Sequence, residues 1–137
     1  MKLLVDGAAQ APGREFRSGG FTVEGTPENF TAVCDLTPAY PAELGLKSCV
    51  RKLRFDGERL TVTDSFAAEK PLEMTVRLFH ECPGVEIAGE GFETSRSELP
   101  LADSWLRAAW GEKLYETRLA APRAAAGEIT YTVEARD

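Results

Sequence analysis

The sequence predicts an all-β fold, an antiparallel β-sandwich of stacked sheets with little or no helix. Apolar and polar residues alternate in most regular segments, most clearly over residues 72–78 and 129–135, and short turn motifs separate these segments. An alternating strand buries one face on a core and leaves the other in water, as antiparallel sheets do. The 137 residues are enough to bury a core without disulfide or metal crosslinks. We therefore expect one domain over residues 1–137.

The individual elements follow from the same alternation and from turn residues. Asp56-Gly57 between two alternating runs is the strongest hairpin signal. Residues 104–110 also fit a short helix, but Trp105 and Trp110 do not share a helical face, which favours a strand. Residues 35–41 contain two prolines and predict a rigid, extended crossing segment. We expect strands near residues 2–6, 20–24, 29–36, 48–56, 59–65, 72–80, 84–88, 91–97, 104–110, 113–120 and 127–135.

Charge limits the classes of partner. Sixteen Lys and Arg against 22 Asp and Glu give a formal charge of -6, which disfavours nucleic acid and anionic membranes. An acidic polysaccharide would need a local basic patch on such a chain. No apolar run is long enough to cross a bilayer. The N-terminus lacks the apolar segment of a signal peptide, so the chain as written is expected in the cytoplasm.

The cysteines and the single histidine indicate no metal or cofactor. Cys34, Cys49 and Cys82 form no C-x-x-C pair, and metal-ligand spacing is absent. Buried free thiols are the favoured interpretation, with one disulfide and a spare thiol as the alternative. No phosphate-binding or dinucleotide glycine motif occurs. His80 ends a strand in phase with Leu78, where a structural role is favoured over a catalytic one.

Basic and aromatic residues supply the candidate binding surface. At strand spacing Lys52 and Arg54 share one face and could form a cationic stripe, or simply guard an exposed strand. Tyr40 could pack on the sheet or present its ring to a sugar. If residues 104–110 form one strand, Trp105 and Trp110 point to opposite faces, so one ring is exposed for a carbohydrate or a domain interface. Core packing is the favoured alternative for both tryptophans.

Four motifs follow one another along the chain, at residues 3–7 with Gln10, residues 33–40, residues 51–55 and residues 60–66. Their order and spacing resemble the C-terminal β-sheet domain of the heparinase II/III-like polysaccharide lyases. In that family a VDG..Q strand opens the domain, a DLT.AY segment crosses it, and an arginine-led strand pairs with one ending in V.D.F. The resemblance covers most of residues 3–88 and, more weakly, the rest.

The resemblance implies stacked antiparallel sheets and a partner that this chain lacks. Members carry an N-terminal α/α toroid with most of the active site, and they cleave uronic-acid polysaccharides by β-elimination. Members often have a histidine just before the opening strand, which His80 does not match. Asp35 matches an aspartate that binds metal in some members, but its histidine partners have no counterparts here. We therefore expect no metal site, and Asp35 to be a turn or cap residue or a partner for Arg51 or Arg54.

Three hypotheses follow. The first is a non-catalytic accessory domain that walls the toroid's cleft and contacts an acidic polysaccharide; its parent could be periplasmic or secreted. An isolated domain of this kind would leave an apolar patch exposed and could self-associate. The second is a free-standing carbohydrate-binding module with exposed aromatics. The third is an active enzyme, which would need His80, an arginine and Tyr40, Tyr115 or Tyr131 within hydrogen-bond reach. The candidate substrate or domain-interface residues are Tyr40, Arg51, Lys52, Arg54, His80, Trp105 and Trp110.

Overall fold

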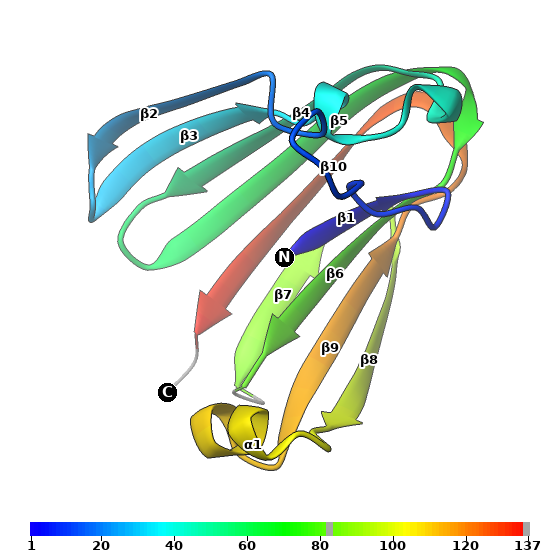
Figure 1. Cartoon of the computed structure of the whole chain (residues 1–137). Coiled ribbons are helices and arrows are strands. Elements are labelled where there is room, and N and C mark those ends of the chain that lie inside the picture. Colours follow the sequence, from blue (N-terminus) through cyan, green and yellow to red (C-terminus); the bar gives the residue numbers. More distant parts are fainter. Residues whose placement is uncertain (82–83, 136–137) are drawn as a thin grey trace.

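The computed structural model describes residues 1–81 and 84–135 and consists of two antiparallel sheets, one lying over the other (Figure 1). The larger sheet has six strands in the order β2-β3-β4-β5-β10-β7, and the smaller has four in the order β1-β6-β9-β8. The all-β sandwich predicted from the alternation is therefore confirmed. The strands of the larger sheet are β2 (Gly20–Thr26), β3 (Asn29–Asp35), β4 (Leu46–Phe55), β5 (Arg59–Leu72), β7 (Val85–Gly89) and β10 (Ala124–Ala135), and those of the smaller are β1 (Lys2–Val5), β6 (Met74–His80), β8 (Glu93–Pro100) and β9 (Lys113–Ala120).

One continuous core fills the space between the sheets. The smaller sheet contributes fully buried side chains such as Met74, Val76 and Leu119, and the larger sheet contributes Val62 and Tyr131. These residues occupy alternate positions of their strands, as the sequence pattern predicts. Burial of this apolar surface is the main force that holds the two sheets together.

Three connections join the two sheets at one end of the sandwich. Glu73 alone separates β5 from β6, residues 90–92 link β7 to β8, and residues 121–123 link β9 to β10. Strand β5 is long because it continues from the Asp56-Gly57 hairpin to this end. These three connections lie at one end of the molecule, whereas β6 ends and β7 begins at the opposite end, where α1 lies (Figure 1).

The prediction of a strand over residues 104–110 is wrong. These residues form helix α1 (Ser104–Trp110). The Asp103 carboxylate accepts hydrogen bonds from the amides of Trp105 and Leu106 at 2.8 and 3.1 Å, which caps the helix. Gly111, with a φ of 82°, ends it. These capping signals outweigh the separation of the two tryptophans around the helix.

The crossing segment at residues 35–41 is not extended as predicted. It contains a 3-10 turn, η1 (Thr37–Ala39), followed by η2 (Ala42–Leu44). The Asp35 carboxylate accepts hydrogen bonds from the amide and the hydroxyl of Thr37 at 3.0 and 2.6 Å. Hydrogen bonding to Thr37 also lowers the pKa of Asp35. A proline is compatible with the first turn of a helix, so the sequence folds back locally instead of crossing straight.

Two further sequence expectations concern thiols and membranes. Cys34 and Cys49 are free thiols, Cys49 fully buried and Cys34 partly so, whereas Cys82 lies outside the described residues. Burial raises the pKa of the Cys49 thiol to about 12. Among the described residues, no helix combines the length and hydrophobicity that a transmembrane span requires.

Candidate functional site

Two predicted surface residues, Tyr40 and Arg51, belong to the interior. The Arg51 guanidinium donates to both carboxylate oxygens of Asp64, at 2.7 and 2.8 Å, and Asp64 is completely buried. Burial lowers the pKa of Arg51, but the hydrogen bond and charge of Asp64 outweigh this and hold it above its ordinary value. The Tyr40 hydroxyl donates to the Leu3 carbonyl at 2.7 Å inside the core. Both side chains are thus held by hydrogen bonds inside the fold, away from the exposed part of the predicted surface.

Tyr40 and Tyr131 provide a matched test of this interior. Tyr40 holds a buried hydrogen bond, whereas the buried Tyr131 hydroxyl has no hydrogen-bond partner among the described residues. We expect Tyr40→Phe to lower the free energy of unfolding by about 1–2 kcal/mol, because the Leu3 carbonyl loses its partner. Tyr131→Phe should leave stability unchanged or raise it by up to about 1 kcal/mol. Urea denaturation of both variants measures the difference, and equal losses would contradict this account.

Lys52 and Arg54 share the outer face of the larger sheet, as their spacing predicts. Lys52 is exposed, but Arg54 is only half-exposed and donates to the backbone carbonyls of Phe30, at 3.1 Å, and Phe55. The Arg54 guanidinium is thus hydrogen-bonded to the backbone of β3 and of its own strand, β4. The predicted cationic stripe reduces to one exposed lysine on this face.

His80 lies in a different place, on the inner face of the smaller sheet. Its ring stacks on Tyr115 with centroids 5.7 Å apart and an interplanar angle of 15°. Its Nε2 is 3.1 Å from the Thr117 hydroxyl, and that pair forms a hydrogen bond. His80 therefore shares neither a sheet nor a face with Lys52, and the predicted surface is split between two layers.

Basic side chains complete the group around His80. The Arg96 guanidinium lies 5.0 Å from the centroid of the Tyr115 ring, and the Lys113 ammonium lies 5.5 Å from it. Glu98 pairs with Lys113 at 2.9 Å on the exposed rim. We call His80, Arg96, Lys113, Tyr115 and Thr117 the basic aromatic cluster. It draws on three neighbouring strands, β6, β9 and β8.

The two tryptophans are on the surface. Trp105 is 85% exposed and Trp110 is 49% exposed, and no residue of α1 is buried. Core packing, the favoured alternative, is therefore wrong for both. The helix precedes β9, the strand of Tyr115 and Lys113, and lies at the end of the smaller sheet opposite the connections at residues 73, 90–92 and 121–123 (Figure 1).

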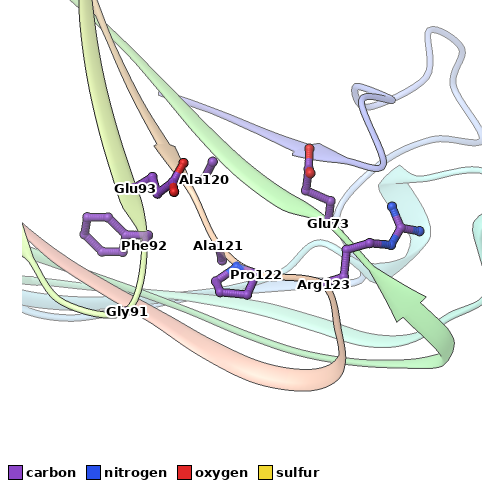
Figure 2. A pocket seen from close by; sticks show the side chains of 8 residues that line it. All are labelled: Glu73, Gly91, Phe92, Glu93, Ala120, Ala121, Pro122 and Arg123. Atoms are coloured by element: carbon purple, nitrogen blue, oxygen red, sulfur yellow. The ribbon is translucent and has the colours of Figure 1, made fainter.

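A hollow at the sheet crossings offers less chemistry. Figure 2 shows Phe92 at one side of it and Arg123 at the other, with Glu73 and Glu93 on its walls. Arg123 is bound to the Asp6 carboxylate at 3.2 Å and to the Pro71 carbonyl at 3.2 Å. The two carboxylates make this hollow a poor site for an acidic ligand. Across residues 1–81 and 84–135, no three His, Cys, Asp or Glu side chains gather as metal ligands.

Sequence reasoning missed Arg96, Lys113 and Thr117, and named Tyr115 only as one of three tyrosines. Arg96 and Lys113 are isolated residues in polar segments, and no local pattern marks them. The Arg51–Asp64 pair could not be read from the turn signal either. A two-residue Asp56-Gly57 turn would place Arg51 opposite Val62, whereas the turn is centred on Gly57 and Glu58 and the register places Arg51 opposite Asp64.

Comparisons with known proteins place the fold. No family model matches the sequence, and no curated protein matches it. The structure is similar to heparan sulfate lyase HepC from Pedobacter heparinus, with a TM-score of 0.62 and 13% identity, over 98% of this chain and 24% of that chain. A mutant of the same enzyme gives a TM-score of 0.61 and 12% identity over the same shares of the two chains. The chain thus spans about a quarter of the length of these lyase structures, and the similarity establishes a shared fold.

Proposed function

We propose that this chain is a non-catalytic β-sandwich domain of a heparinase II/III-like polysaccharide lyase, lining one wall of a substrate cleft and contacting an acidic polysaccharide. The observation that carries the proposal is the match of 98% of this chain to 24% of a heparan sulfate lyase. Nearly the whole chain corresponds to one part of a larger enzyme. The four sequence motifs point to the same family, independently of the structure.

The partner would be an α/α-toroid domain, in the same parent chain or a separate one. Elimination from a uronic acid requires a base, an acid and a cation that neutralises the carboxylate. In the basic aromatic cluster, His80 and Arg96 contact the ring of Tyr115, and His80 hydrogen-bonds to Thr117. These contacts pack the tyrosine ring, and its hydroxyl is linked to Lys113, whose pKa is raised chiefly by its hydrogen bond to Glu98, so that its ammonium is not a base. The cluster therefore supports binding of an anion better than proton transfer.

The cluster fits an acidic sugar by its charge. Arg96 and Lys113 are two exposed cations beside the same tyrosine ring, on a chain of net charge -6. Guanidinium and ammonium groups donate charge-assisted hydrogen bonds to carboxylate or sulfate oxygens. We propose that they contact these groups of the polysaccharide, with Tyr115 holding both side chains in place.

The test is binding of the purified chain to heparan sulfate and other uronic-acid polysaccharides. We expect Arg96→Ala with Lys113→Ala to weaken binding by roughly tenfold or more, because two charge-assisted contacts are lost. Isothermal titration calorimetry at low salt measures the affinity. Ultraviolet absorbance of the same samples detects any unsaturated product.

Lys52→Ala is the matched control, since Lys52 is an exposed cation on the other sheet. Binding that is weakened by the Lys52 variant and not by the double variant would move the contact to the outer face of the larger sheet. Failure of the wild-type chain to bind any of these polysaccharides would contradict the sugar contact. Formation of unsaturated product would contradict the non-catalytic role.

A free-standing carbohydrate-binding module is the second candidate, favoured by the 85% exposure of Trp105. Exposed indole rings stack on the apolar faces of sugars whatever their charge. A module of this kind would bind neutral polysaccharides as well, and Trp105→Ala would abolish that binding. Binding restricted to acidic polysaccharides and insensitive to Trp105→Ala would favour the lyase domain.

A further inference from the structure

Strand β2 forms an open edge of the larger sheet. Among the described strands it pairs only with β3, and all seven of its residues are exposed. Its apolar side chains Phe21 and Val23 are 62% and 55% exposed, and Glu24 is its one charged residue. In Figure 1, β2 and β3 extend beyond the smaller sheet, which leaves this part of the inner face uncovered. Edge strands of natural proteins are commonly protected by charge, proline or a covering segment.

The hydrogen-bond pattern shows which backbone groups of β2 face outward. The Leu36 amide donates to the Cys49 carbonyl, so the even-numbered positions of β3 face β4 and the odd-numbered ones face β2. The odd-numbered residues of β3 lie opposite Thr22, Glu24 and Thr26. Since facing alternates along a strand, the N–H and C=O groups of Phe21, Val23 and Gly25 point to the open edge.

An apolar hollow lies beside this edge on the inner face. Gly25 lies opposite Phe30 on β3, and Val23 lies opposite Ala32. Gly25 has a φ of 111°, and a Cβ added there would run into the Asn29 carbonyl and the Phe30 Cα, so this position of the edge carries no side chain. The hollow is lined by Phe21, Val23, Gly25, Thr26, Pro27, Phe30, Ala32 and Leu53.

We propose that a second copy of this chain pairs antiparallel along β2, with a two-fold axis between the two Val23 residues. In this register Phe21 of each copy lies opposite Gly25 of the other, and its ring enters the hollow beside Phe30. The Val23–Val23 pair and the two Phe21–Gly25 pairs each exchange two hydrogen bonds. The outward N–H and C=O groups of residues 21, 23 and 25 are then all satisfied. The two larger sheets become one continuous sheet across the interface.

Strand β2 is complementary to itself, and for this reason the proposed partner is a second copy of the chain. The bulky residue, Phe21, and the one without a side chain, Gly25, lie at equal distances on either side of Val23. On the outer face Glu24 lies opposite Thr22 of the other copy, so no like charges meet directly. An isologous contact of this kind closes as a dimer and does not propagate.

Sedimentation velocity over a wide dilution series tests the dimer. We expect the wild-type chain to be a reversible dimer and Val23→Lys to raise its dissociation constant at least about tenfold, because two lysines would face each other at the axis. Thr22→Lys is the matched control: it adds the same charge on the outer face, opposite Glu24, and should leave the dimer intact. A chain that is monomeric at every concentration, or a dimer that Val23→Lys does not weaken, would overturn the proposal.

Cysteine crosslinking tests the register. Residues in a hydrogen-bonded antiparallel pair have Cα atoms about 5.5 Å apart, a spacing that a disulfide spans. Val23→Cys should therefore form a disulfide-linked dimer on mild oxidation, while Thr22→Cys and the wild-type chain should not. Equal crosslinking of the two cysteine variants would overturn the Val23-centred register. The test uses no polysaccharide, so its result is independent of the proposed lyase role.

Discussion

Replacing Arg51 with methionine should lower the free energy of unfolding by about 3–5 kcal/mol. The Arg51 side chain is 12% exposed and Asp64 is fully buried, and two hydrogen bonds of 2.7 and 2.8 Å join them between β4 and β5. Without Arg51, Asp64 must either keep an unpaired charge in the core or take up a proton on folding. Both cost free energy. Urea denaturation followed by circular dichroism measures the loss.

Two further variants separate the buried charge from the loss of packing. Arg51→Met combined with Asp64→Leu should recover most of the lost stability, since apolar residues can replace a buried ion pair at little cost. Arg59→Met breaks the exposed pair with Glu134 at the far end of the same hairpin and should have a much smaller effect. A mild effect of Arg51→Met, similar to that of Arg59→Met, would contradict the structural role assigned to the Arg51–Asp64 pair.

The strands were predictable because their information is local. Period-two alternation and the Asp56-Gly57 turn locate β4 and β5, although the turn is centred one residue later, on Gly57 and Glu58, so the exact register did not follow from the Asp-Gly signal. The two errors in element type, at residues 35–41 and 104–110, also have local causes. Asp35 and Asp103 each accept hydrogen bonds from amides that follow them, and these bonds favour a helical turn over an extended chain.

The candidate site was less predictable because it depends on contacts between distant segments. Alternation places Arg51 and Lys52 on opposite faces, but it does not say which face meets the core. The buried position of Asp64 between Val62 and Phe66 decides this, and it makes Arg51 structural. The basic aromatic cluster needs β9 to lie between β6 and β8. The residue pattern within a single strand does not reveal which strands are neighbours in the sheet. His80 was therefore predicted as a candidate without Arg96, Lys113 and Thr117.

Raising the pH above about 9 should destabilise the fold steeply, because three acidic groups are buried in their neutral form. Desolvation raises the pKa of Cys49 from 9.0 to about 12, and it also raises the pKa of Tyr40 and Tyr131. The nearby Asp64 carboxylate adds to each of these shifts by repelling a second negative charge. In the unfolded chain these groups release their protons at ordinary pKa values.

The sign follows from the protons that each state binds. Above the unfolded pKa the native state keeps a proton that the unfolded state loses, so stability is complete below that pH and falls as the pH rises. Each group contributes a slope of up to about 1.4 kcal/mol per pH unit. Ionisation of Cys49 in the unfolded chain lowers the free energy of unfolding from about pH 9, and ionisation of the two tyrosines lowers it further from about pH 10. Urea denaturation at successive pH values measures the slope.

Single variants assign the slope to its groups. Cys49→Ala should remove the decline that begins near pH 9 while costing some packing at every pH, and Tyr131→Phe should reduce the slope only above about pH 10. The packing cost shifts the whole curve and the lost proton changes its slope, so the two effects are read separately. A free energy of unfolding that stays level through this range would mean that the three groups ionise as readily in the folded chain as in the unfolded one. The buried placement of the thiol and both hydroxyls would then be wrong.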